Sequence, residues 1–390
     1  MNSTSVEDID RLEITGRVRA ALRDLMRIDR YQWDERGALT LHGQLLGPAD
    51  ALYRQIRAQM EPLGFTPFLQ RQADDDELMA LPLVIERRPP RIGLPVALFV
   101  ITMFTVLLTG AINQRNECVA TFADILRTIG AVLTSPAALS AGLPFAATLI
   151  GILFTHEMGH YVVGRLRRAP ISLPYFIPLP PFISFTGTMG AVIVQREPME
   201  DRRTILEVGI AGPLAGLAIA IPLLLYGLAT SQVGAPPAPP PGCPAGYTQE
   251  GNSLLYIAAK WLVFGRFLPS GGVDVQLSPV AWGAWIGLLV TMLNLLPIGQ
   301  LDGGHVAYAL LGVRAHQLAY LLIGVCVLLG VLVSSTWLFW ALLAFLIGPR
   351  HPAPLNDISR LDRRHAALAI FGLIVFAMLL MPEPLKIVTP

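Results

Sequence analysis

The clearest chemical pattern in the chain is a short stretch with two histidines and a glutamate, His156-Glu157-Met158-Gly159-His160. On a helix, residues four apart project from one face, so the imidazoles of His156 and His160 can bind one metal ion. Neutral imidazoles suit zinc, and a catalytic zinc site generally has three protein ligands and one position for water. Glu157 can accept a proton from that water and later donate it to a leaving amine. The pattern therefore predicts a hydrolytic zinc site whose third protein ligand must come from elsewhere in the chain.

Such a short pattern also occurs by chance in proteins that bind no metal. Its surroundings argue against chance, because the chain has no charged residue from Gly142 to Thr155. Ionisable groups inside a membrane span are costly and by default indicate a functional site. We therefore interpret the histidine pair as a metal site within the membrane.

The composition indicates the class of protein. Of the 390 residues, 53% are hydrophobic and 15% are charged. Soluble domains carry about 25% charged residues, so an integral membrane protein in a lipid bilayer is expected. A formal net charge of +1 gives no reason to expect a nucleic-acid partner. The three cysteines (Cys118, Cys243 and Cys326) are not spaced in pairs, which argues against a disulfide framework and against a cysteine-based zinc site.

Long apolar stretches predict an α-helical polytopic membrane protein with about seven spans. The predicted spans cover about residues 92–112, 143–166, 205–228, 280–296, 317–333, 337–347 and 366–381. Arginines in the linker 86–91 and after the second span, at 165–168, place the N-terminus and this end of the second span in the cytoplasm. The polar, acidic N-terminus predicts no cleavable signal peptide. A multi-pass protein of a cell inner membrane is expected.

Two domains are expected, a small cytoplasmic α+β domain over residues 1–90 and a membrane-embedded domain over 91–390. In the first domain, sequence periodicity predicts helices over 18–26 and 50–60 and strands over 38–43, 65–71 and 77–84, with a solvated acidic turn at 74–76. This domain is a candidate position for a regulatory partner or a ligand.

The segment 170–195 is uncharged, yet its five prolines exclude a continuous helix. Two short apolar runs, Phe182–Phe185 and Ala191–Val194, have the character of strands. Strand backbone persists at membrane depth only where protein or a water-filled cavity covers it. The sequence therefore predicts a membrane-dipping β-hairpin beside the metal, with a plain apolar loop as the alternative.

The third metal ligand is expected from Asp302, in the stretch 294–305 that ends the fourth span. Prolines and glycines in this stretch prevent a regular helix, and the predicted topology brings it to the depth of the two histidines. Asp302 has no cation beside it in the sequence, and one zinc ion per chain would provide its partner. Asn294 either donates a hydrogen bond to a developing oxyanion or caps broken backbone. His305 is expected to support the site rather than to bind the metal.

These motifs together resemble a known family. The pairing of the His-Glu-Met-Gly-His stretch at 156–160 with Leu301-Asp302-Gly303 resembles the site-2 protease family of intramembrane zinc metalloproteases. Gly212-Pro213 and the residues 294–297 are also similar to that family's pattern, although close helix approach alone explains small residues at 212 and 216. The resemblance covers about residues 92–311, the expected catalytic core.

The resemblance implies that His156, His160 and Asp302 are zinc ligands and that Glu157 is the general base. It also implies a transmembrane protein substrate that is cleaved near the cytoplasmic face, often after another protease has trimmed its outer part. Two features depart from the best-known pattern of the family. The polar domain at 1–90 is not a standard part of the core, and no PDZ-like domain is apparent between the motif spans.

A transmembrane substrate arrives as a helix, whose backbone hydrogen bonds shield the scissile carbonyl. An exposed strand edge can hold such a substrate unwound by pairing with its main chain. We predict that Ala191, Val192, Ile193 and Val194 form this edge.

Two other functions fit parts of the pattern. Metal or solute transporters also place histidine and aspartate inside the membrane. However, the H-E-x-x-H motif and a distant aspartate together supply all the residues that a hydrolytic zinc site needs. A catalytically inactive protease relative that binds membrane proteins need not keep its base, so Glu157 argues against that reading. Metal flux into vesicles, compared with peptide cleavage in detergent, separates these functions.

Overall fold

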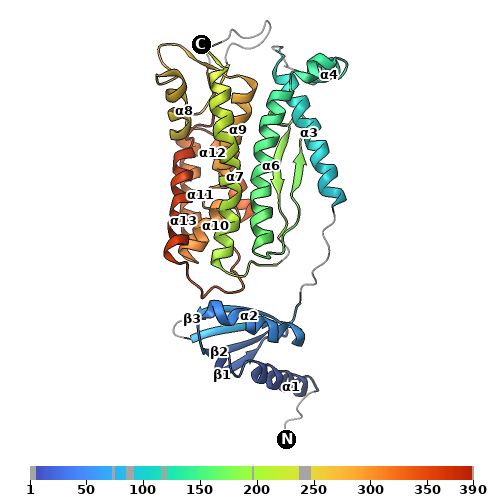
Figure 1. Ribbon diagram of the computed structural model, residues 1–390, viewed down its shortest axis with the longest axis vertical. Helices are drawn as coiled ribbons and strands as arrows, with labels where there is room; N and C mark the ends of the chain where they lie inside the picture. The colour runs from blue at the N-terminus through green and yellow to red at the C-terminus, as the bar shows by residue number, and fades with distance from the viewer. Residues whose placement is uncertain are drawn as a thin grey trace. The chain divides into compact units, whose positions relative to one another are not determined.

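The computed structural model describes residues 6–72, 75–84, 92–115, 117, 121–195, 197–236 and 247–388. These residues are mainly helical with small sheets (Figure 1), as expected for an α-helical membrane protein. They fall into two compact units. The first unit draws on the segments Met1–Arg88, Arg196–Ile205 and Pro352–Ala366, and the second on Pro89–Gln195, Leu206–His351 and Ala367–Pro390.

The first unit contains a four-stranded antiparallel sheet in the order β1-β2-β4-β3. Its elements are α1 (Val6–Ala21), β1 (Met26–Trp33), β2 (Leu39–Leu45), α2 (Ala49–Met60), the short 3-10 helix η1 (Glu61–Leu63), β3 (Thr66–Gln72) and β4 (Asp75–Leu81). Apolar side chains of both α-helices and of the sheet form one core. The helix predicted over 50–60 and the strands predicted near 38–43 and 65–71 agree with this structure.

Other predictions for this region differ from the structure in their bounds or in burial. The helix predicted over 18–26 ends at Ala21, and Met26 begins β1, a strand with mostly exposed side chains and therefore little apolar alternation. The last strand begins at Asp75 and ends at Leu81. Asp76 is buried rather than solvated, because its carboxylate accepts hydrogen bonds from the Arg71 guanidinium at 2.7 Å and from the Leu45 N–H at 3.0 Å. Asp74 lies outside the described residues, as does the linker 86–91.

Two later segments of the chain complete the first unit. The N–H of Leu69 on β3 donates to the Leu355 carbonyl at 2.7 Å, and the N–H of Leu355 donates to the Met199 carbonyl at 2.9 Å. The Leu355 side chain is fully buried in the core of the unit. Arg57 of α2 also pairs with the buried carboxylate of Glu197 at 2.7 Å. The compact unit therefore includes more of the chain than residues 1–90.

The second unit is a bundle of apolar helices. Its helices are α3 (Gly93–Asn113), α4 (Phe122–Leu133), α5 (Pro136–Ser140), α6 (Leu143–Leu166), α7 (Arg202–Ala229, whose first turn belongs to the first unit), α8 (Leu254–Phe264), α9 (Pro279–Asn294), α10 (Asp302–Leu311), α11 (Arg314–Leu332), α12 (Thr336–Ile347) and α13 (Arg363–Leu379). By length and apolar composition, α3, α6, α7 and α11 can each cross a membrane, and α8, α9 and α12 are shorter apolar helices. The number of spans stays a prediction.

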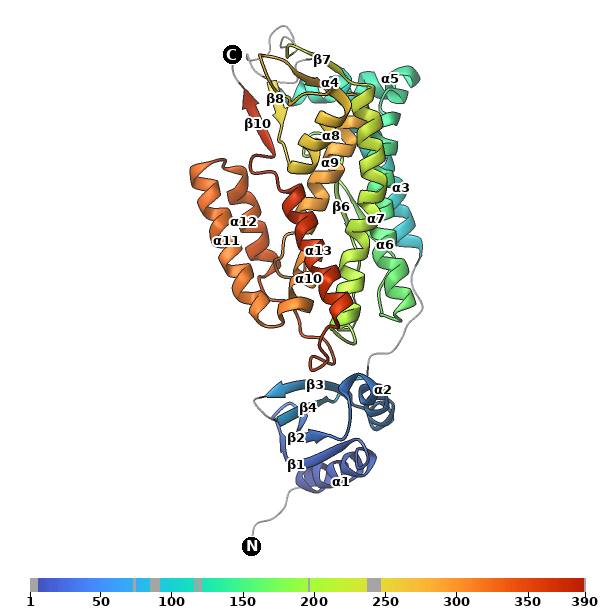
Figure 2. The same cartoon turned by 60° about the vertical axis from the view of Figure 1, so that its left-hand side comes forward.

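Two small sheets lie at the end of the bundle where α3 ends and α9 begins. One pairs β7 (Gln232–Gly234) with β9 (Asp274–Gln276), and the other pairs β8 (Tyr247–Glu250) with β10 (Leu385–Val388). Figure 2 shows β8 and β10 side by side above α13. Residues 237–246, between β7 and β8, lie outside the described residues.

A β-hairpin follows α6 and lies between α6 and α3 (Figure 1). It pairs β5 (Tyr175–Pro178) with β6 (Thr188–Val192) in antiparallel register, with Tyr175 opposite Val192. The first strand was wrongly predicted at 182–185, because Pro180 starts a turn there and its carbonyl accepts the N–H of Ile183 at 3.0 Å. The second strand begins before the predicted residue and ends at Val192, so Ile193 and Val194 lie beyond it.

Small residues let α6 pack closely against its neighbours. A side-chain carbon at Gly159 would lie 2.6 Å from the carbonyl oxygen of Ala211 on α7, and one at Gly287 of α9 would lie 2.8 Å from Ile152. A carbon atom does not approach backbone so closely, so glycine at 159 allows α6 and α7 to approach this far, while at 287 an added carbon would require Ile152 to shift. The helix that carries the histidine pair is therefore fixed from two sides.

We expect Leu355→Ala to destabilise the first unit by about 2–4 kcal/mol, because the change leaves a cavity in its core. Amide hydrogen exchange of the full-length protein would measure this as lost protection at the Leu69 N–H and its neighbours. Leu46→Ala is the matched control, since Leu46 is 58% exposed in the same unit. Equal protection in Leu355→Ala and in the wild-type protein would contradict the assignment of this segment to the core.

Candidate metal centre

The histidine pair lies on α6, which has the bounds that the sequence predicts, Leu143–Leu166. An apolar run favours this helix, with Pro144 in its first turn and Arg165 in its last. His156 and His160 are 3% and 8% exposed, and Glu157 between them is 6% exposed. The three polar side chains are thus held inside the bundle rather than at its surface.

The structure brings Asp302 to the two histidines. The Nε2 atoms of His156 and His160 lie 3.2 Å from Oδ2 and 3.3 Å from Oδ1 of Asp302, respectively, and 3.1 Å from each other. Asp302 begins α10, directly before two glycines. Side-chain carbons at Gly303 and Gly304 would lie 1.9 Å and 2.2 Å from backbone oxygens of the preceding turn. These glycines therefore allow the chain to turn back so that Asp302 reaches the histidines.

The three ligand atoms fit a zinc ion. A metal held tetrahedrally at 2.0–2.1 Å by nitrogen and oxygen requires ligand atoms about 3.3 Å apart, close to the observed separations. The Nδ1–H of His160 donates to the Val208 carbonyl at 2.7 Å, which leaves the Nε2 lone pair facing the site. Within the part of the chain that the structure describes, these residues are the one group of three or more His, Cys, Asp or Glu that could hold a metal.

Glycines of α7 make room for the imidazoles. A side-chain carbon at Gly212 would lie 2.0 Å from His160 Nε2, and one at Gly216 would lie 3.2 Å from His156 Cβ. The small residues at 212 and 216 thus allow α6 and α7 to approach closely. The groups of α6 that lie against these two glycines are the side chains of His160 and His156. Sequence reasoning missed the Val208 carbonyl, because a backbone acceptor leaves no signal in residue type.

The other predicted site residues take different positions. Asn294 is the last residue of α9, and its Nδ2 lies 3.2 Å from His156 Nε2. His305 is bound through Nδ1 to the Leu301 carbonyl at 2.9 Å, and its ring contacts the ring of His351 with centroids 4.7 Å apart. It does not belong to the ligand group, and its supporting role stays a prediction.

The residues predicted to bind substrate lie on or just after β6, the strand next to α6. Ala191 packs against the core of the bundle, whereas Val192 and Val194 are about half exposed, at 49% and 48%. Ile193 is partly exposed. The N–H of Val194 donates to the Ser172 hydroxyl at 2.9 Å, and its carbonyl accepts the Ser172 N–H at 3.0 Å. The main chain of Val194 is therefore already paired.

Comparison with known proteins agrees with this geometry. Residues 144–333 match the family model described as peptidase family M50. The probable zinc metalloprotease EGY2, chloroplastic, of Arabidopsis thaliana is 27% identical over 363 residues, which cover 89% of this chain and 61% of that protein. The corresponding EGY1 protein of Oryza sativa subsp. japonica is 30% identical over 251 residues, covering 63% of this chain and 41% of that protein. No solved structure matches the chain.

A helix with an H-E-x-x-H motif that meets a distant aspartate forms a group that could hold a metal, and this group lies among apolar helices. Residues 144–333, which include His156, His160 and Asp302, are thus similar to peptidase family M50, the site-2 protease family. The resemblance seen in the sequence is thereby confirmed. The chain spans about three fifths of the length of the EGY2 proteins that it matches.

His160→Ala and Asp302→Ala should each weaken zinc binding at least about 100-fold, because the loss of a direct donor costs more than the loss of a supporting contact. Metal analysis of the purified full-length variants at a fixed free zinc concentration measures this. His365→Ala provides a control, because His365 lies in the first unit and pairs with Asp362. Full zinc occupancy in both ligand variants would end the assignment.

Proposed function

We propose that this protein is a zinc endopeptidase that hydrolyses peptide bonds of transmembrane proteins within the bilayer, near its cytoplasmic face. The observation that carries this proposal is the convergence of the buried His156 and His160 with the partly buried Asp302, beside Glu157 and between helices apolar enough to span a membrane. The names of the relatives, which describe zinc metalloproteases, support a peptidase over a transporter or an inactive binding protein.

In this proposal His156, His160 and Asp302 hold one zinc ion per chain. When bound, zinc acts as a Lewis acid that lowers the pKa of water and polarises a carbonyl. Glu157 accepts the proton of the attacking water and delivers it to the leaving amine nitrogen. Asn294 lies close enough to His156 to donate a hydrogen bond to the carbonyl oxygen of the scissile peptide. The Val208 carbonyl keeps the His160 ring in its orientation and tautomer.

The proposal includes a seven-span topology in a cell inner membrane with the N-terminus in the cytoplasm. Arg165 lies in the last turn of the histidine helix, Arg167 and Arg168 follow it, and Arg363 and Arg364 begin α13, which supports a cytoplasmic position for both ends. The spans would be the four long helices together with α9, α12 and α13. A cysteine at position 168 that reacts with an impermeant reagent outside intact cells would contradict this orientation.

We further propose that β6 holds the substrate unwound by main-chain pairing. One edge of β6 pairs with β5, and no other strand of the described residues pairs with β6. The exposed side chains of Met189 and Val192 support access to this strand. Because the Val194 main chain already pairs with Ser172, the pairing would lie on β6 rather than along all of Ala191–Val194.

The first unit would carry a regulatory partner or ligand. It includes the first turn of α7, where the Asp201 carboxylate accepts the Thr204 N–H at 2.8 Å. The same helix carries the Val208 carbonyl that orients His160. A change in the first unit would thus reach the metal ligands along one helix. If Leu355→Ala, which loosens this unit, cleaves at the wild-type rate, regulation does not pass this way.

Glu157→Gln should keep zinc but lower cleavage about 100- to 10,000-fold, because an amide cannot accept the proton of water. Cleavage of a single-span substrate and metal content would be measured on the same preparation. Glu207→Gln is the matched control, since Glu207 pairs with Arg167 and not with the ligand group. Near wild-type cleavage by Glu157→Gln would exclude Glu157 as the base, and metal flux into vesicles would then test a transporter.

Val192→Pro should lower cleavage about tenfold or more while zinc content persists, because proline removes a donor from the proposed strand edge. Val192→Ala keeps the N–H and serves as the control for loss of the side chain. Substrates with helix-breaking residues near the cut should be least affected, since they need less help to unwind. Normal cleavage by the proline variant would show that β6 does not hold the substrate.

A further inference from the structure

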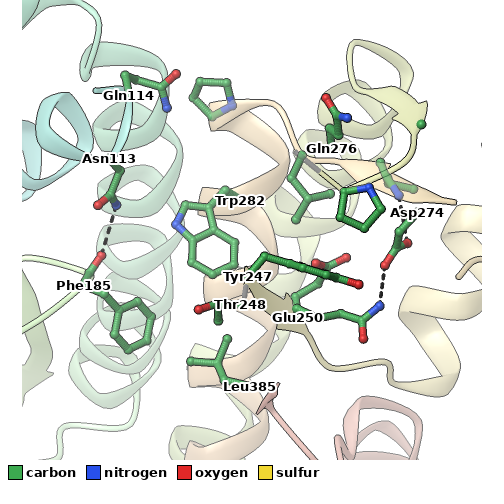
Figure 3. A pocket seen from close by; sticks show the side chains of 16 residues that line it. Asn113, Gln114, Phe185, Tyr247, Thr248, Glu250, Asp274, Gln276, Trp282 and Leu385 are labelled. Atoms are coloured by element: carbon green, nitrogen blue, oxygen red, sulfur yellow. Dashed lines mark hydrogen bonds between the residues drawn. The ribbon is translucent and has the colours of Figure 1, made fainter. Parts of the chain in front are cut away.

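A cavity lies in the helical unit, at the end of the bundle away from Asn294. It has a volume of about 620 Å³ and is lined by the end of α3, the turn of the β5–β6 hairpin, strands β8, β9 and β10, and the start of α9. We call it the outer pocket, and Figure 3 shows Trp282, Tyr247 and Glu250 together within it. Nothing in the proposed hydrolytic chemistry uses these residues.

Aromatic side chains provide a rigid wall of the outer pocket. The ring of Trp282 stacks on Trp285, with centroids 5.1 Å apart and planes inclined by 6°. Trp285 is fully buried, and its Nε1–H donates to the Gly251 carbonyl at 2.9 Å. Phe185 and Tyr247 line the same pocket. Because Trp282 is held by an anchored neighbour, its face can receive a ligand without loss of side-chain freedom.

The floor of the pocket carries two acidic side chains. Glu250 and Asp274 line it and are both 8% exposed. Lys260 interacts with both carboxylates, is 1% exposed and has Nζ 3.9 Å from Asp274 Oδ1, too far for a hydrogen bond. Two carboxylates thus face one ammonium group. Burial raises the pKa of Glu250 and lowers that of Lys260, because each charged form is poorly solvated there.

The position of the outer pocket relates it to the metal centre. Trp282 lies in the first turn of α9, and Asn294 beside His156 is its last residue, about 18 Å further along the helix axis at 1.5 Å per residue. The hairpin covers the same interval, since Phe185 in its turn lines the pocket and β6 runs next to α6. An extended peptide at about 3.3 Å per residue spans this distance with about six residues, and a helical one with about twelve.

We propose that the outer pocket binds a basic side chain, lysine or arginine, on the extracytoplasmic flank of the substrate. This inference rests on the proposed endopeptidase function. A cation placed over Trp282 and beside Glu250 gains both a cation–π contact and a charge-assisted hydrogen bond, and it balances the excess carboxylate. The basic residue lies about six to twelve residues from the cut, depending on how far the substrate is unwound.

The test uses full-length protein in detergent and a single-span reporter with one lysine scanned through the outer flank, each position paired with glutamine. In the wild-type protein, lysine about six to twelve residues from the cut should lower KM about tenfold relative to glutamine, with kcat unchanged. Glu250→Gln and Trp282→Ala should each remove this difference and leave the KM of the glutamine reporter as it was. Glu383→Gln and Trp261→Ala are matched controls, because neither residue lines the pocket.

Equal KM values for lysine and glutamine reporters at every position would overturn the proposal. So would a lysine preference that survives in both pocket variants. Binding of labelled lysine and glutamine flank peptides to the Glu157→Gln protein separates this result from failure of the peptidase proposal. If the wild-type protein cleaves no reporter but the Glu157→Gln protein binds the lysine peptide more tightly than the glutamine peptide, the pocket stands and the proposed hydrolysis fails. If lysine is preferred over glutamine neither in peptide binding nor in reporter cleavage, the pocket assignment is wrong.

Discussion

The structure depends on one costly arrangement, two imidazoles and a carboxylate facing one another inside an apolar bundle. The ring nitrogens of His156 and His160 lie 3.1 Å apart, and each lies within 3.3 Å of an oxygen of Asp302. Such groups lose their hydration on burial and need a compensating charge. Zinc would supply it, and the rest of the bundle can be understood as the packing that holds three donors at this separation.

That packing relies on residues without side chains. Gly212 leaves space for an imidazole, while Gly303 and Gly304 let the chain reverse so closely that Asp302 can begin a helix beside α6. The geometry therefore depends on close backbone approach more than on large apolar side chains. Dense packing of this kind resists deformation, which suits a site that must hold its ligands in place while a substrate enters.

Much of this arrangement could be predicted because strong local patterns encode it. The limits of α6 follow from an uncharged run that arginines terminate, and the two motifs that meet there have characteristic residue types. Other features could not be predicted. Strand β1 is mostly exposed and lacks apolar alternation, and the true first strand of the hairpin, Tyr175–Pro178, has prolines before and at its end, which favour a break. The outer pocket is assembled from separate segments, so no single stretch of sequence indicates it.

The space at Gly212 has a consequence for related sequences. Because even one added carbon there would overlap the Nε2 atom of His160, a chain with any larger residue at this position cannot keep that imidazole where it is in this structure. Retention of the two histidines and the glutamate is then not enough to identify a working member. A glycine about three helical turns into α7 is a separate criterion for a site that can keep this geometry.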